Sequence, residues 1–146
     1  ETMRNEYLYD FYRIAFLSVK QKCTDGVTNA AKPALVIAVI EGIAAGEIKN
    51  NQIKFQDIKA RYIRKLEEWQ PEKTPLKYPF YHLEGDGFWH LKWKFAPSAK
   101  IVSPSAIFLR DNIDYAYFDN ALWDLLQEEE VRKGYVEAIT KYFKNA

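Results

Sequence analysis

Apolar residues recur at helical spacing in three stretches of the first half of the chain. Residues 5–22 are predicted to form an amphipathic helix, ended by the Thr-Asp-Gly step at 24–26. The residues expected on its buried side are Tyr7, Phe11, Ile14, Ala15, Leu17 and Ser18. Residues 34–40 are all apolar and follow Pro33, which suits the first position of a helix, and Gly46 is placed to cap its C-terminus. We therefore expect a second helix that is buried on nearly every side.

A third helix is predicted after the Asn-Asn turn at 50–51 and a short extended piece at 52–55. Its apolar positions are Ile58, Tyr62, Ile63, Leu66 and Trp69, and its other face carries Lys59, Arg61, Arg64 and Lys65. Two helices joined by a short turn, the second of them basic, are compatible with a helix-turn-helix or winged-helix arrangement. Many helical hairpins share this pattern, so it is only a weak indication of a DNA-binding motif.

Residues 80–93 are predicted to form a β-hairpin that follows a proline-bearing loop at 70–79. Glu-Gly-Asp-Gly at 84–87 provides turn chemistry between two aromatic segments with a period of two. Asp119 can cap a helix that contains Leu122 and Trp123, and residues 128–144 form a last helix. The predicted fold class is α+β and mainly helical, with a helix-turn-helix or winged-helix-like core, a β-hairpin and C-terminal helices.

Length and composition fit one globular domain covering residues 1–146. The chain has 146 residues, of which 48% are hydrophobic and 28% charged, and no apolar run approaches the roughly 20 residues needed to span a bilayer. The first residues lack the layout of a signal peptide, and the single cysteine, Cys23, cannot form an internal disulfide. We expect a cytoplasmic protein with no membrane association. Whether the natural chain is longer is left open.

Charge is distributed unevenly along the chain although the net charge is only +1. Residues 49–100 hold eleven Lys and Arg against six Asp and Glu, whereas the two flanks together hold ten against fourteen. A basic segment attracts polyanions, but a solvated helix face gives the same count, and both interpretations stay open.

The sequence contains no constellation of residues that indicates catalysis. Its two histidines, His82 and His90, cannot supply a four-ligand zinc site, and a catalytic zinc held by them and Asp86 is a weak alternative. Cys23 fits an ordinary small side chain better than a nucleophile, and residues 84–87 lack the lysine and following helix of a phosphate-binding loop. We expect no metal, no cofactor and no enzymatic activity in this chain.

Two sequence stretches are more specific than composition. Residues 32–43 (KPALVIAVIEGI) and residues 78–91 (YPFYHLEGDGFWHL) resemble the N-terminal domain of McrA-type HNH restriction endonucleases. Residues 113–116 and 142–143 are similar to the closing helices of that domain. Characterised members are sulfur-binding domains, which recognise DNA carrying a phosphorothioate. The resemblance implies a non-catalytic module that binds double-stranded, modified DNA within a restriction system, without the HNH nuclease domain itself.

The resemblance also implies a site. Tyr78 and Pro79 would form an apolar seat for sulfur, and Lys32 would neutralise the phosphorothioate. His82 lies in the same motif, and the candidate contacts to the DNA backbone are Lys49, Arg61, Arg64, Lys65, Lys77 and Lys92. Two departures weaken the expected selectivity, since Ala31 stands where many members have histidine and Lys32 where the known sulfur binders have arginine, whose planar fork lysine lacks.

Each of these assignments has a structural alternative. Pro79 can end a loop, Tyr78 can be a half-buried core aromatic, and Lys32 can be a solvated residue before a helix. The alternative function is a protein-interaction or regulatory domain that keeps the fold without recognising a modification. An HNH nuclease domain in cis or in trans and a homodimer are further partners that stay open.

Overall fold

The computed structural model describes residues 2–19, 23–24, 27–28, 30–70, 73–95 and 104–144. The helices in these ranges are α1 (Thr2–Leu17), α2 (Ala31–Ala44), α3 (Phe55–Trp69), α4 (Lys77–His82), α5 (Ala106–Asn112), α6 (Asn120–Leu125) and α7 (Glu129–Lys144), with a short 3-10 helix, η1 (Leu83–Asp86). The strands are β1 (Cys23–Thr24), β2 (Val27–Thr28), β3 (Trp89–Trp93) and β4 (Ile113–Phe118). The predicted fold class, α+β and mainly helical, is confirmed.

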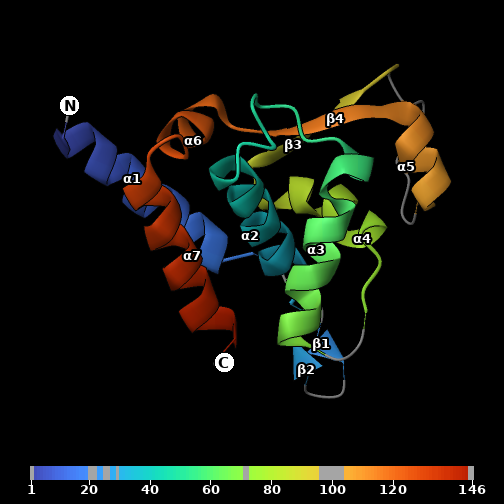
Figure 1. Cartoon of the computed structure of the whole chain (residues 1–146), viewed down its shortest axis with the longest axis horizontal. Helices are drawn as coiled ribbons and strands as arrows, with labels where there is room; N and C mark the ends of the chain where they lie inside the picture. Colours follow the sequence, from blue (N-terminus) through green and yellow to red (C-terminus); the bar gives the residue numbers. More distant parts are fainter. Residues whose placement is uncertain are drawn as a thin grey trace.

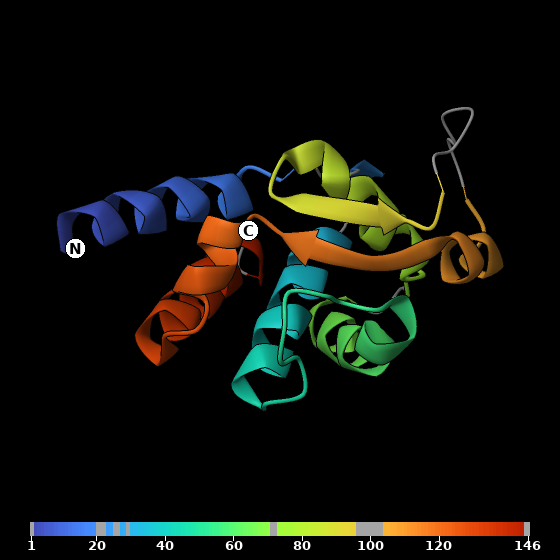
Figure 2. The ribbon, with the colours of Figure 1, turned by 90° about the horizontal axis from the view of Figure 1, so that it is seen from above.

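Helix α2 is the centre of the molecule. It lies between α7 and α3 (Figures 1 and 2), and every side chain from residue 34 to residue 40 is buried, as the uninterrupted apolar run predicts. Pro33 lies in the first turn, two residues after the helix begins, where its missing N–H costs nothing. Gly46 follows the last turn with a φ of +77°, so its predicted role at the C-terminus of the helix is confirmed.

Helix α1 buries a different face from the one that the sequence predicted. Tyr12 and Phe16 enter the core, whereas Tyr7, Phe11 and Ile14 are exposed. Aromatic residues occupy both sides of this helix, so periodicity alone could not select the inner side. The helix also ends at Leu17 instead of continuing to the Thr-Asp-Gly step, and residues 20–22 lie outside the described ranges.

The predicted hairpin at residues 80–93 is wrong. Residues 77–82 form helix α4, and β3 pairs in antiparallel register with β4, so that Trp89 lies opposite Phe118 and Leu91 opposite Ala116. Residues 113–116, which resemble a closing helix in sequence, are therefore a strand. The indole N–H of Trp89 donates to the carbonyl oxygen of Phe80 at 2.9 Å, which holds α4 against the strand in place of a second hairpin arm.

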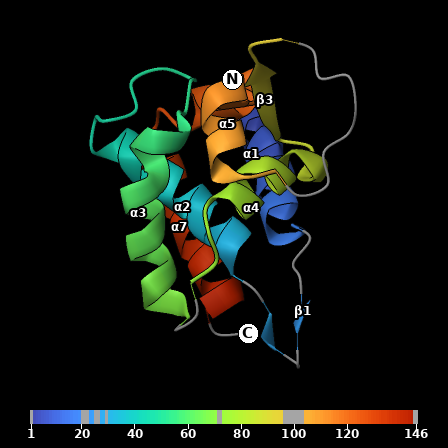
Figure 3. The ribbon, with the colours of Figure 1, turned by 90° about the vertical axis from the view of Figure 1, so that its right-hand side faces the viewer.

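Helices α2 and α3 lie side by side and run in opposite directions (Figures 1 and 3). The two-stranded antiparallel unit of the fold is formed by β3 and β4. The helix-turn-helix or winged-helix detail of the prediction is not confirmed. Strands β1 and β2 form a separate small sheet at the end of the molecule where α3 ends (Figure 3).

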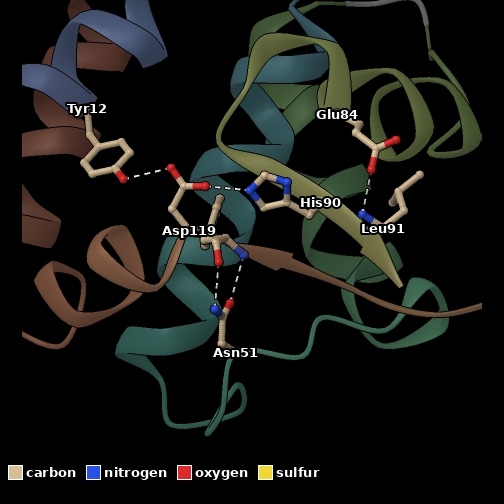
Figure 4. Close-up of polar contacts among 7 residues, drawn as sticks. Tyr12, Asn51, Glu84, His90, Leu91 and Asp119 are labelled. Carbon is tan, nitrogen blue, oxygen red and sulfur yellow. Dashed lines mark hydrogen bonds and ion pairs between the residues drawn. The ribbon is translucent and has the colours of Figure 1, made fainter. Parts of the chain in front are cut away.

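Both edges of the β3–β4 pair are covered. On the β4 side, the backbone of Ile53 exchanges two hydrogen bonds with Ala116, and the Asn51 side chain exchanges two with the backbone of Phe118 (Figure 4). On the β3 side, a carboxylate oxygen of Glu84 accepts the backbone N–H of Leu91 at 3.0 Å. The short extended piece predicted before α3 therefore serves as an edge partner of β4.

Among the described helices, none combines the length and the apolar character that crossing a membrane requires.

Candidate functional site

Lys32 and Asp86 form an ion pair between the first turn of α2 and the end of η1. The Lys32 Nζ atom lies 2.6 Å from an Asp86 carboxylate oxygen, and the two side chains are 16% and 3% exposed. A carboxylate buried to this degree needs a cation close by. The charge of Lys32, which the sequence assigned to a phosphorothioate, is therefore already compensated within the protein.

Tyr78 and Pro79 lie in the first turn of α4 and face different environments. The Tyr78 side chain is partly exposed, at 38%, whereas Pro79 is buried beside Phe80 on the inner face of the helix. The Lys77 ammonium group lies over the Tyr78 ring, 4.9 Å from its centre. The ring of Tyr78 and the charge of Lys77 thus form the outward part of the predicted seat, whereas Pro79 is buried.

The outward face of α4 continues into an aromatic cluster. Because residues 78, 81 and 82 are three and four positions apart, they share one side of the helix. The Tyr81 ring contacts the rings of both His82 and Trp93, and Trp93 in turn contacts Phe108 of α5. We call this surface the α4–α5 surface; it consists of Lys77, Tyr78, Tyr81, His82, Trp93 and Phe108.

The basic residues predicted on α3 lie in a different place, and two of them are already paired. Arg61 Nε lies 2.7 Å from a Glu47 carboxylate oxygen, and Lys65 contacts both Glu41 and Glu68. The bond to Glu47 is the main cause of the raised pKa of Arg61, and the same bond lowers the pKa of the Glu47 carboxyl. The groove between α2 and α3 is consequently lined by both signs of charge.

Arg64 lines the same groove and is exposed, with no ion pair to any residue in the described ranges. Lys49, in the turn after α2, and Lys92, on the outward face of β3, are likewise exposed. The structure therefore brings Lys77, Tyr78, Pro79 and His82 together on α4. It leaves the α3 cations on a surface of their own.

Asp119 connects three elements in a way that the sequence did not reveal. One of its carboxylate oxygens accepts a hydrogen bond from the Tyr12 hydroxyl at 2.8 Å, and the other lies 2.5 Å from His90 Nε2 (Figure 4). Burial, followed by this hydrogen bond and the charge of Asp119, raises the pKa of Tyr12. The sequence predicted a helix cap at this position. Asp119 does stand at the N-cap of α6, but its side chain binds α1 and β3 instead of capping.

Metal-binding chemistry finds no support in the described ranges, where no three His, Cys, Asp or Glu side chains are grouped so as to hold an ion. His82 and His90 lie on α4 and β3, and His90 is engaged with Asp119. The side chain of Cys23 lies outside the described part of the chain.

The fold and surface define a mainly helical α+β domain with a cluster of partly exposed aromatic rings beside Lys77 on a short helix. Structure comparison shows that this fold is similar to that of sulfur-binding domains of McrA proteins. The sulfur-binding domain of ScoMcrA complexed with phosphorothioated DNA matches with a TM-score of 0.72 and 14% identity, over 90% of this chain and 86% of that one. The sulfur-binding domain of SprMcrA complexed with phosphorothioated DNA matches with a TM-score of 0.72 and 16% identity, over 92% and 85% of the two chains.

A longer protein gives the same match. The type IV phosphorothioation-dependent restriction endonuclease ScoMcrA aligns with a TM-score of 0.69 and 13% identity, over 90% of this chain but only 29% of that protein. The present fold thus corresponds to one part of that endonuclease. By sequence, no protein-family model and no curated protein matches the chain.

Proposed function

We propose that this chain is a DNA-recognition module that reads phosphorothioate-modified duplex DNA as part of a restriction system, with its contact surface on α4. The observation that carries the proposal is the α4–α5 surface, where Lys77 and Tyr78 stand beside a run of touching rings. The Lys77 ammonium group can neutralise a DNA phosphate, and the partly exposed Tyr78 ring beside it offers an apolar contact to the same group. The similarity in fold to domains solved with phosphorothioated DNA supports the same function.

The chemistry of the modification fits the exposed part of the seat. Sulfur is larger and more polarisable than oxygen and accepts hydrogen bonds less well, so an apolar ring favours it over a hydrated phosphate oxygen. The Tyr78 ring is accessible for this contact, whereas Pro79 is buried and offers little surface to a ligand. Because Asp86 compensates Lys32, Lys77 is the cation that we assign to the phosphorothioate group.

A competition assay tests the proposal directly. Two duplexes of one sequence, one plain and one with an Rp phosphorothioate, compete for the protein over a salt series. We expect tighter binding of the modified duplex and weaker binding of both as salt rises. Equal affinity for the two duplexes would remove the modification from the proposal, and no binding at low salt would remove DNA altogether.

Variants of α4 locate the surface. Tyr78→Ala is expected to reduce the preference for the modified duplex, and Lys77→Ala to weaken binding of both duplexes. The matched control is Tyr142→Ala, because Tyr142 is a similarly exposed tyrosine on α7. Equal effects of Tyr78→Ala and Tyr142→Ala would contradict the placement of the site on α4.

A second candidate function rests on a different observation. Tyr7, Phe11 and Ile14 form an exposed apolar stripe on α1, of the kind that marks a protein-interaction surface. A protein-interaction domain that keeps this fold would bind neither duplex at low salt. The competition assay therefore separates the two functions.

An HNH nuclease domain, in cis or in trans, is the partner that we propose for the DNA-recognition module.

A further inference from the structure

Helix α1 carries an apolar stripe that no described part of the chain covers. Tyr7, Phe11 and Ile14 are 75%, 56% and 57% exposed, and their spacing of four and three residues places them on one side of the helix. The opposite side of the helix packs against the rest of the protein. Tyr12 and Phe16 are buried, and the Tyr9 ring stacks on the Tyr135 ring of α7 with 4.5 Å between the ring centres. The N-terminal part of α1 extends beyond the other helices (Figures 1 and 2).

The stripe has the symmetry that a second copy of itself requires. If two α1 helices pack antiparallel with Tyr7 of one against Ile14 of the other, each Phe11 lies within about 2 Å, along the axis, of its counterpart, given a rise of 1.5 Å per residue. Each apolar residue then meets an apolar residue of the copy. A two-fold related contact of this kind closes on itself and yields a dimer.

The charges beside the stripe fit the same register. Glu6, Asp10 and Arg13 all lie along one flank of it, and in an antiparallel pair that flank faces the same flank of the copy. Arg13 then lies about 3 Å along the axis from both Glu6 and Asp10 of the second copy. Within one chain, Arg13 has only a loose contact with Asp10, at 3.7 Å with both side chains well exposed, so it is available to a partner. In a parallel pair this flank would instead face the opposite flank of the copy, where the uncharged Leu8 and Ala15 lie.

We propose that the chain forms a homodimer through antiparallel contact of the Tyr7, Phe11 and Ile14 stripe with the same stripe of a second copy. The proposal does not depend on DNA binding, since α1 carries none of the residues assigned to the DNA surface. Measurements of the oligomeric state made without DNA therefore test the proposal.

Sedimentation equilibrium over a wide range of protein concentration tests it. The wild-type chain should show a reversible monomer–dimer equilibrium, and Phe11→Asp should weaken dimerisation about tenfold or more, because it places a charge at the centre of the contact. The matched control is Ile107→Asp, which adds the same charge at a similarly exposed apolar residue on α5 and should leave the equilibrium unchanged. A chain that stays monomeric at every concentration, or an equal effect of the two variants, would overturn the proposal.

A charge exchange tests the antiparallel register. Arg13→Glu should weaken the dimer, and the triple variant Glu6→Arg/Asp10→Arg/Arg13→Glu should restore it, because the exchanged charges again face opposite charges of the copy. Circular dichroism of each variant checks that α1 is still folded. A triple variant that remains as weak as Arg13→Glu would overturn the antiparallel arrangement.

Discussion

The ammonium group of Lys32 lies 2.6 Å from the carboxylate of Asp86, a residue 54 positions further along the chain. The contact fixes the first turn of α2 to the end of η1, the segment that directly follows α4. Since the Asp86 side chain is almost fully buried, this pair has a structural role whether or not Lys32 also meets DNA.

Replacement of Lys32 by methionine should destabilise the fold by about 3 kcal/mol, because it removes the cation beside a buried carboxylate. Urea unfolding measures the loss. In the double variant Lys32→Met/Asp86→Leu, the total loss should be clearly smaller than the sum of the two single losses, since no buried charge remains. Additive single losses would show that the two groups do not act as a pair.

Gly134→Ala should destabilise the protein although alanine is the better helix former. A Cβ atom at this position of α7 would collide with the Tyr9 hydroxyl oxygen, and Tyr9 is held by its stack on Tyr135. Overpacking of this kind costs about 1–3 kcal/mol, more than the gain of up to about 1 kcal/mol from helix propensity.

Thermal or urea unfolding of Gly134→Ala measures this cost. Gly85→Ala, at a glycine with open space around it, is the control and should be nearly neutral. Adding Tyr9→Phe to Gly134→Ala should recover part of the loss by removing the oxygen that collides. If Tyr9→Phe recovers none of the lost stability, the collision with the Tyr9 hydroxyl is not the cause of the loss.

Stability should decline at alkaline pH. Burial raises the pKa of the Tyr62 hydroxyl above its ordinary value of 10, and it does the same for Tyr135. The unfolded chain then loses these protons near pH 10 while the folded chain keeps them. Stability that is fully present below about pH 10 is therefore lost as the pH rises above it.

Tyr62→Phe tests this dependence. At neutral pH it should cost about 1 kcal/mol, because the Tyr62 hydroxyl donates to the Thr74 carbonyl oxygen at 2.6 Å. Above pH 10, the free energy of unfolding of Tyr62→Phe should decline less steeply with pH than that of the wild type. Urea midpoints measured at a series of pH values compare the slopes, and identical slopes would mean that Tyr62 does not contribute.

The cations of α3 should differ in their effect on DNA binding. Arg64→Ala removes a charge that has no ion pair within the described ranges and should reduce the slope of log affinity against log salt by about 0.9 if Arg64 contacts a phosphate. The control is Arg61→Ala/Glu47→Ala, which removes a neutral pair and should leave the slope unchanged. Equal slopes for wild type and Arg64→Ala would exclude Arg64 from the DNA surface.

Much of the helical part of the fold could be predicted from the sequence. The apolar run that forms α2, the glycine after it and the amphipathic pattern of α3 each depend on local spacing, and all appear as expected. The face of α1 could not be predicted, because Phe11 and Phe16 are both aromatic and packing against Phe88 and Tyr135, far along the chain, decides which is buried.

Individual residues of the candidate site could be predicted from the sequence, but their arrangement could not. Motif resemblance selected Tyr78 and Pro79, but the sequence placed them in a loop instead of a helix. Residues 77–83 fit helical spacing as well as alternation, and the strand that pairs with β3 is β4, far along the chain. The partner of Lys32 was missed for a related reason. Asp86 reads as a turn residue, and its proximity to α2 arises only from the packing of η1.

The covered edges of the β3–β4 ribbon limit how copies of this domain can associate. A two-stranded sheet with open edges would be free to add a strand from a neighbour and grow into aggregates. Here Glu84 binds the β3 side, and Ile53 with Asn51 binds the β4 side. Addition of a further strand at these positions is thereby hindered, which lowers the tendency of this ribbon to aggregate by strand pairing.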